Sequence, residues 1–120
     1  MARIMITDDA AFMRLMVRTA LESNGHEVVG EAENGNDAIK VYQQVKPDVV
    51  TMDITMPDMD GVTAVKRILE TNPQAKIIMC SAMGQTGMVM EALKAGAKDF
   101  VVKPFQIERL LQSIDKQLTS

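Results

Sequence analysis

The sequence predicts an α/β domain: an open, doubly wound sheet of five parallel strands between two helical layers. Five short, almost continuously apolar runs alternate with five longer segments in which apolar residues recur at helical spacing. Strands that are each followed by a helix pair in parallel, and five such units are too few for an eight-stranded barrel. The 120 residues fit one domain, so we expect a single domain over residues 1–120 with no separate output domain.

The predicted strands are apolar runs bounded by residues that favour turns or carry charge. The third and fourth runs, Val-Val-Thr-Met and Ile-Ile-Met-Cys, have the composition of strands buried on both faces. The strands are expected at residues 4–7, 28–32, 48–53, 76–81 and 99–103.

The first predicted helix has an apolar stripe that we expect to face the sheet, with Arg14 and Arg18 on the opposite side. Asn24-Gly25 ends this helix, because glycine adopts the left-handed conformation of a helix end without strain. The stripe consists of Met13, Met16, Val17, Ala20 and Leu21.

The other four helices show the same periodicity, over residues 38–45, 62–69, 88–95 and 107–118. A proline follows the second and third, and the residue before a proline is biased away from helix. Gly96 ends the fourth. Pro104 is expected to open the fifth, because proline suits the first turn of a helix.

Composition limits the classes of function. A net charge of −3, from 13 basic and 16 acidic residues, argues against a nucleic-acid binder. The single cysteine cannot form a disulfide within the chain, which fits a reducing compartment. The N-terminus lacks the apolar region of a signal peptide, and no apolar run approaches the ~20 residues of a membrane span. We therefore expect a cytoplasmic protein that is not inserted in a membrane.

Polar side chains follow four of the predicted strands. Asp8 and Asp9 follow the first, Asp53 ends the third, Ser81 the fourth and Lys103 the fifth. In an open parallel sheet these ends share one edge, where ligands bind. The sequence therefore predicts a site made of three carboxylates, one hydroxyl and one amine.

The chemistry of this set favours phosphoryl transfer with a divalent cation. Three carboxylates packed together would repel one another, and a hard cation removes that conflict. Magnesium prefers oxygen ligands, whereas zinc usually takes histidine or cysteine, which are absent from the set. An aspartate can be the nucleophile that accepts a phosphoryl group. Lys103 and the Ser81 hydroxyl would then bind phosphoryl oxygens.

Each of these residues also has a simpler interpretation. Asp8 and Asp9 could cap the first helix, and Asp53 could cap a loop. Lys103 could be a solvated surface lysine, and Pro104 could mark only a helical first turn. If all of these simpler interpretations held, polar residues suited to one site would follow four separate strands by chance. A shared site is therefore favoured.

The residues of this site resemble those of the response-regulator receiver domains of two-component signalling. The resemblance rests on Asp8-Asp9, Asp53, Ser81 and Lys103-Pro104, with the stretches MDITMPDMDG and CSAMGQ, and it covers essentially the whole chain. It implies the flavodoxin-like strand order 2-1-3-4-5 in three layers. Within the family, the chain is most similar to single-domain chemotaxis regulators.

The resemblance implies a role for each position. Asp53 would be the phosphoacceptor, and Ser81 and Lys103 would bind the phosphoryl group. The Mg²⁺ ligands would be Asp8, Asp9, Asp53 and the backbone carbonyl of Thr55.

The resemblance further implies that Ser81 and Phe100 form a switch pair, and that the Lys103–Pro104 peptide bond is cis. In that switch the hydroxyl moves toward the phosphoryl group and the aromatic ring turns inward behind it. Two positions depart from the commoner pattern: serine replaces threonine at 81, and phenylalanine replaces the tyrosine of many chemotaxis regulators at 100.

The implied function is that of a phosphoacceptor switch, which catalyses only its own phosphorylation and dephosphorylation, rather than a metabolic enzyme. Its implied partners are a sensor histidine kinase of the CheA type, a flagellar motor switch protein of the FliM type and a phosphatase. The motor switch would dock on the fourth helix, fifth strand and fifth helix of a monomer. The alternative is a stand-alone receiver acting as a phosphorelay intermediate or as a non-chemotaxis regulator.

Two other classes of protein fit the residues less well. A phosphatase of the haloacid-dehalogenase type needs a second aspartate two residues after the nucleophile, where this chain has Thr55. A flavodoxin-like cofactor binder needs a hydroxyl- and glycine-rich phosphate loop after the first strand, where this chain has Asp8 and Asp9. The P-loop motif of nucleotide-binding proteins is also absent from the sequence.

Overall fold

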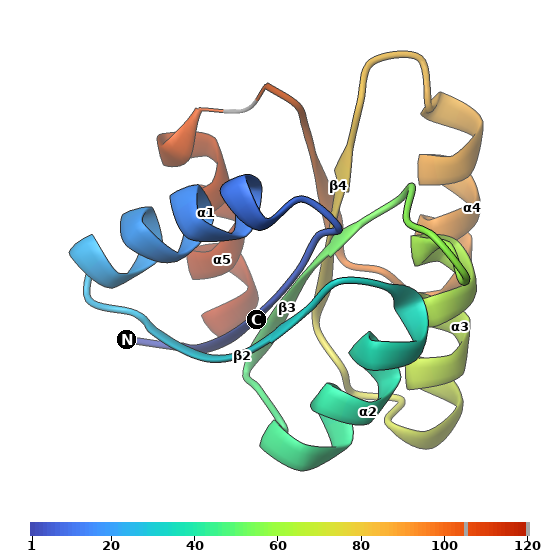
Figure 1. The fold of residues 1–120 in the computed structure, drawn as a ribbon, viewed down its shortest axis with the longest axis horizontal. Helices are drawn as coiled ribbons and strands as arrows, with labels where there is room; N and C mark the ends of the chain where they lie inside the picture. Colours follow the sequence, from blue (N-terminus) through green and yellow to red (C-terminus); the bar gives the residue numbers. More distant parts are fainter. Residues whose placement is uncertain (105, 120) are drawn as a thin grey trace.

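The five strands form one parallel sheet in the order β2-β1-β3-β4-β5, and a helix follows each strand (Figure 1). The computed structural model describes residues 1–104 and 106–119. The predicted fold class and strand order are confirmed. The elements are β1 (Arg3–Thr7), α1 (Ala11–Ser23), β2 (Glu27–Ala32), α2 (Gly35–Val45), β3 (Val49–Asp53), α3 (Gly61–Thr71), β4 (Ile77–Ser81), α4 (Thr86–Ala95), β5 (Asp99–Val102) and α5 (Ile107–Leu118).

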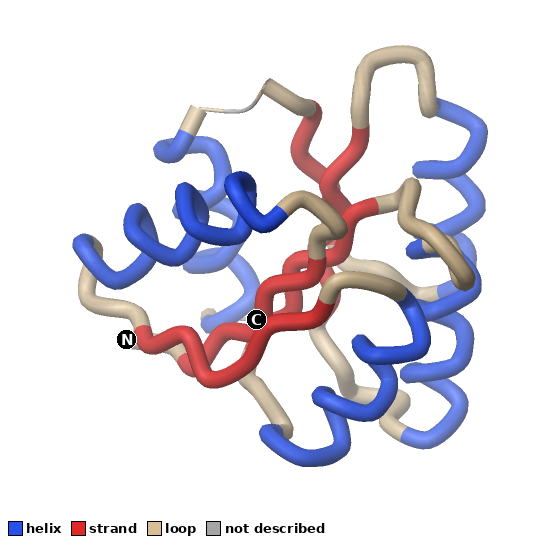
Figure 2. Tube along the Cα trace, viewed as in Figure 1, coloured by secondary structure: helices blue, strands red, loops and turns tan. Residues whose placement is uncertain are grey.

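Helices cover both faces of the sheet, with α1 and α5 on one side and α2, α3 and α4 on the other (Figure 2). Successive side chains of a strand point to opposite faces, so each strand contributes to two separate cores. Met5 and Val50 belong to the core under α2, α3 and α4, whereas Ile4, Ile6 and Val49 belong to the core under α1 and α5. β3 and β4 are buried along their whole length, which explains their continuous apolar composition.

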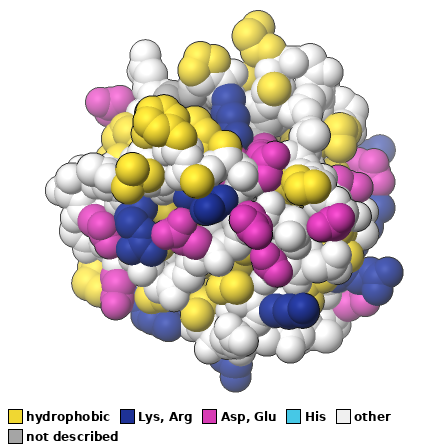
Figure 3. Space-filling model, in the orientation of Figure 1, with side chains coloured by type: hydrophobic (Ala, Val, Ile, Leu, Met, Phe, Trp, Pro, Cys, Tyr) yellow, Lys and Arg dark blue, Asp and Glu magenta, His cyan; other side chains and the backbone are white. Residues whose placement is uncertain are grey.

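Helix α1 is rotated relative to the predicted orientation. Val17 and Leu21 are buried as predicted, but Met16 is 49% exposed, so its predicted place on the core side was wrong. Arg14 and Arg18 pair instead with Glu31 of β2, at 3.1 and 2.6 Å. These ion pairs turn the arginines toward the edge strand. Apolar side chains consequently gather on the surface over α1 (Figure 3), and the exposed ones are Phe12, Leu15 and Met16.

The last helix has the predicted apolar segment, residues 107–118, but it does not begin at Pro104. Helix α5 begins at Ile107, preceded by Gln106 in an extended conformation, so the prediction that Pro104 opens this helix was wrong. The Lys103–Pro104 peptide bond is cis. Among residues 1–104 and 106–119, no helix has the length and apolar character needed to cross a membrane.

Candidate functional site

Four strands deliver the predicted site residues to one edge of the sheet. Asp53 is the last residue of β3 and Ser81 the last of β4, while Asp8 and Lys103 directly follow β1 and β5. The parallel register aligns these ends, because Asp53 is paired with Cys80 and Ser81 with Val102. Residues separated by up to 95 positions in the sequence therefore meet at the carboxyl edge of the central strands.

Three carboxylates form the acidic part of this edge. Asp8, Asp9 and Asp53 each place a carboxylate oxygen within 4.8 Å of the other two. Asp8 and Asp53 are buried, and Asp9 is exposed to solvent. A donor set made only of oxygen atoms and partly open to water fits Mg²⁺, which keeps several water or phosphate ligands. These three residues can therefore hold the cation that the sequence predicted.

Lys103 neutralises part of this negative charge. Its Nζ atom lies 2.7 Å from Asp8 Oδ2 and 3.3 Å from Asp53 Oδ1. Burial of the ammonium group opposes its charge, but the hydrogen bond to Asp8 and the charge of Asp53 prevail, so the pKa of Lys103 is raised. Lys103 is consequently a fixed cation of the site and not the solvated lysine of the simpler interpretation.

Asp53 has the most perturbed carboxyl group of the described residues. Only 7% of Asp53 is exposed, and burial raises its pKa from 3.8 to about 6. Lys103 lowers the pKa, while the charges of Asp8 and Asp9 raise it further. Asp53 is still largely ionised at neutral pH, so its carboxylate is available as a nucleophile. Strongly perturbed groups in a cleft are typical of functional sites.

The capping interpretation does not account for Asp8 and Asp9. The N-cap residue of α1 is Ala10, whose side chain makes no capping hydrogen bond. Asp8 Oδ1 instead accepts a 2.9 Å hydrogen bond from the Ala10 N–H, and Arg14 donates to the Asp8 backbone carbonyl at 2.7 Å. These contacts fix the orientation of Asp8, whose other carboxylate oxygen faces Lys103.

Gly61 supports the backbone of Asp53, which the sequence analysis did not anticipate. The Gly61 N–H donates to the Ile54 carbonyl at 2.7 Å. A Cβ atom at position 61 would collide with the Asp53 carbonyl oxygen. The glycine thus lets the start of α3 pack directly against the end of β3. The sequence signal was present, since Gly61 directly precedes the third helical pattern, but it did not reveal this contact.

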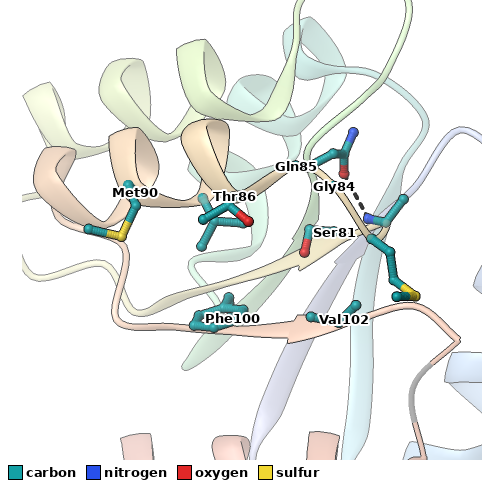
Figure 4. A pocket seen from close by; sticks show the side chains of 10 residues that line it. Ser81, Gly84, Gln85, Thr86, Met90, Phe100 and Val102 are labelled. Atoms are coloured by element: carbon teal, nitrogen blue, oxygen red, sulfur yellow. Dashed lines mark hydrogen bonds between the residues drawn. The ribbon is translucent and has the colours of Figure 1, made fainter.

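Gln85 is a second residue that the sequence analysis missed. Its Oε1 atom accepts a 2.7 Å hydrogen bond from the Ala82 N–H (Figure 4). Its Nε2 atom donates to Thr55 Oγ1 at 2.6 Å. Gln85 thereby joins the loop after β4 to the loop after β3. Both loops border Asp53, so this side chain belongs to the site.

A cavity of about 330 Å³ lies between the start of α4 and β5. Ser81 lines its end nearest the acidic site, and Phe100 and Val102 line the β5 side (Figure 4). Phe100 is 37% exposed. The two residues of the predicted switch pair therefore border one common cavity, which has room for movement of the ring.

Comparison with known proteins agrees with the geometry of the site. The family model described as the response regulator receiver domain matches residues 4–115. The chain is 61% identical to the chemotaxis protein CheY of Bacillus subtilis, over 97% of both chains. It is 57% identical to the chemotaxis protein CheY of Thermotoga maritima, over 95% of both. A chain in the crystal structure of a CheX-CheY-BeF3-Mg²⁺ complex from Borrelia burgdorferi superposes with a TM-score of 0.92 and 35% identity, over 97% of this chain and 88% of that one.

Proposed function

The chain belongs to the response regulator receiver domain family, and from this premise we propose that it is a phosphorylation-activated response regulator of the chemotaxis type. The observation that carries the proposal is the position of Asp53, a buried carboxylate beside the Lys103 ammonium and two further aspartates. This combination of a nucleophile, a fixed cation and an oxygen-rich metal site is what phosphoryl transfer to an aspartate requires.

The transfer step follows from the chemistry of these groups. A carboxylate oxygen of Asp53 attacks phosphorus, and the phosphorus–nitrogen bond of a donor phosphohistidine breaks, with its electron pair leaving on the imidazole. The Lys103 ammonium, 3.3 Å from Asp53, offsets the charge of the incoming phosphoryl oxygens. The Ser81 hydroxyl donates a hydrogen bond to one of them.

The metal would be held by Asp8, Asp9 and Asp53, with the backbone carbonyl of Thr55 as a further oxygen ligand. Mg²⁺ at this position would supply charge neutralisation for the carboxylates and for the phosphoryl group. Asp8 is already oriented by its hydrogen bond from Ala10, and its other carboxylate oxygen, which accepts from Lys103, would turn to the cation.

The output would follow from the new charge on Asp53. An aspartyl phosphate adds acceptor oxygens that draw the Ser81 hydroxyl toward them. Movement of Ser81 changes the cavity that it shares with Phe100, and the ring turns inward. The surface of α4, β5 and α5 then differs between the two states, and a partner that prefers one of them shifts the population.

The partners that we propose follow the similarity to CheY proteins. A histidine kinase of the CheA type would be the phosphodonor, and a flagellar motor switch protein of the FliM type would bind the phosphorylated state. A phosphatase would shorten the lifetime of the acyl phosphate.

Intact-mass measurement after incubation with acetyl phosphate tests the proposal. We expect a gain of one phosphoryl group that hydroxylamine removes, that requires Mg²⁺ and that is absent in Asp53→Asn. The matched control is Asp115→Asn, which changes an exposed aspartate on α5 that is not part of the acidic cluster. Failure of the wild type to gain mass with Mg²⁺ present would contradict the phosphoacceptor role of Asp53.

A further inference from the structure

The side chain of Gln85 connects the two loops that lie beside Asp53. Gln85 Oε1 accepts from the Ala82 N–H at 2.7 Å (Figure 4). Gln85 Nε2 donates to Thr55 Oγ1 at 2.6 Å. Ala82 directly follows Ser81 at the end of β4, and Thr55 lies two residues after Asp53. One side chain thus fixes the spacing of both loops.

We propose that Gln85 is a positioning residue that opposes phosphorylation by holding these loops in the unphosphorylated arrangement. The inference rests on the proposed phosphoacceptor function of Asp53. A phosphoryl group there brings three acceptor oxygens to the edge of the sheet. The Ala82 N–H is a backbone donor next to the Ser81 hydroxyl, and it is engaged as long as Gln85 accepts from it. Release of Gln85 frees this donor and separates the loop from Thr55.

The anchoring of the β4–α4 loop supports this role. Its start is fixed, because the Lys103 N–H donates to the Ser81 carbonyl at 2.6 Å. Beyond that point Ala82, Met83 and Gly84 are exposed, so packing contributes little to their position. The two hydrogen bonds of Gln85 therefore contribute a large part of the free energy that favours one conformation of this loop over another.

A simple capping role does not explain the contacts. Gln85 is the N-cap residue of α4, and its backbone carbonyl accepts from the Val89 N–H at 3.0 Å. That function needs no particular side chain. The contact with Thr55, 30 positions away in the sequence, lies outside the helix and links two separate loops.

The test compares Gln85→Met, Thr55→Val and Gln44→Met. Gln85→Met keeps the length of the side chain and removes both hydrogen bonds, and Thr55→Val removes only the bond between the loops. Gln44→Met makes the same substitution at an exposed position of α2 and is the matched control. The readouts are amide hydrogen exchange at Ala82 without Mg²⁺, and the affinity for beryllofluoride, an analogue of the phosphoryl group, with Mg²⁺.

For Gln85→Met we expect faster exchange at Ala82 and an affinity for beryllofluoride roughly three- to tenfold higher, because one or two hydrogen bonds are lost from the unphosphorylated state alone. Thr55→Val should show a smaller increase in affinity, and Gln44→Met none. If Gln85→Met does not fold, an increase in Thr55→Val still supports the link and no increase overturns it.

The outcomes separate the two proposals. Unchanged or weaker binding of beryllofluoride by folded Gln85→Met, with normal binding by the wild type, would overturn the role of Gln85 alone. Lack of binding by the wild type, together with no phosphoryl gain from acetyl phosphate, would overturn the phosphoacceptor function and this inference with it.

Discussion

The ammonium group of Lys103 lies 2.7 Å from a carboxylate oxygen of Asp8, nearer than the 3.3 Å to Asp53. Lys103 therefore stabilises both buried carboxylates before any cation or phosphoryl group arrives. A divalent cation needs oxygen atoms of the same residues, so the ammonium and the cation compete by charge repulsion.

We expect Lys103→Met to bind Mg²⁺ more tightly than the wild type and to lose phosphoryl uptake. In EDTA its free energy of unfolding should fall by roughly 1–3 kcal/mol, because the buried carboxylates lose their partner. Calorimetric Mg²⁺ titration and urea unfolding measure the two effects. The control is Lys98→Met, at an exposed position before β5, which should change neither. Weaker Mg²⁺ binding by Lys103→Met would argue against this competition.

The raised pKa of Asp53 predicts a pH-dependent stability. Burial, with help from Asp8 and Asp9 and against Lys103, raises this pKa from 3.8 to about 6. Folding therefore favours the protonated form of Asp53. The contribution of this carboxyl group to the free energy of unfolding is complete below about pH 4 and is lost as the pH rises through about 6. Other carboxyl groups also titrate, so the informative quantity is the difference between the wild type and Asp53→Asn.

In EDTA we expect Asp53→Asn to gain in stability relative to the wild type by up to roughly 3 kcal/mol between pH 4 and pH 7. Saturating Mg²⁺ should reduce this gain, because the cation stabilises the ionised wild-type site. Chemical unfolding of both proteins at several pH values measures the difference. A difference that does not change with pH would show that Asp53 titrates as an ordinary carboxyl group.

The contact between Gly61 and Asp53 predicts that Gly61→Ala disturbs the site. The added Cβ atom would collide with the Asp53 carbonyl oxygen, so the start of α3 or the end of β3 must move. We expect a loss of at least roughly 1–3 kcal/mol in thermal or urea unfolding, together with slower phosphorylation by acetyl phosphate.

Gly87→Ala is the matched control. Gly87 lies within α4, and apart from its chain neighbours and the backbone of its own helix no atom of the described residues lies within 4 Å of the position that its Cβ would occupy. Alanine favours helix over glycine, so this variant should gain about 0.5–1 kcal/mol. Equal stability of the two alanine variants would contradict the close approach at Gly61.

The fold class and the core of the site could be predicted because they depend on local patterns, whereas the strand order was implied by the family resemblance. An apolar run such as Ile77-Ile78-Met79-Cys80, short and followed by a helical pattern, indicates a strand buried on both faces. Once the strands are known to be parallel, their carboxyl ends must share an edge, and this brings Asp8, Asp53 and Lys103 together without knowledge of any contact.

The features that could not be predicted depend on how helices, strands and loops pack against one another. Helical spacing identifies the apolar stripe of α1 but not its rotation, which the ion pairs of Arg14 and Arg18 with Glu31 influence. Proline is common in a first turn, yet α5 begins only at Ile107. The bond between Gln85 and Thr55 joins two loops whose relative position no local pattern predicts.

The backbone of Phe100 is held in place by residues around it. Its carbonyl accepts from Arg109 Nη2 at 2.9 Å, and its N–H donates to Asp99 Oδ1 at 2.8 Å. Asp99 is itself bound by Ser113 and Arg109, and these hydrogen bonds prevail over burial, so its pKa is lowered. The ring of Phe100 can therefore change position through its own side-chain torsions while β5 stays fixed.

We expect Phe100→Ala to lose the structural response to phosphorylation while still accepting the phosphoryl group. Phe100 is the one aromatic residue among the described residues that line the cavity, so its movement should shift the methyl resonances of Met90 and Val102 through its ring current. On addition of beryllofluoride and Mg²⁺, these shifts should be large in the wild type and largely absent in Phe100→Ala.

The control is Phe12→Ala. Phe12 is 70% exposed and lies on α1, on the other side of the sheet (Figure 2), so this variant should respond like the wild type. Equal methyl shifts in Phe100→Ala and the wild type would exclude the ring as the moving part, and would leave movement of the Ser81 loop as the source of the change in the α4 surface.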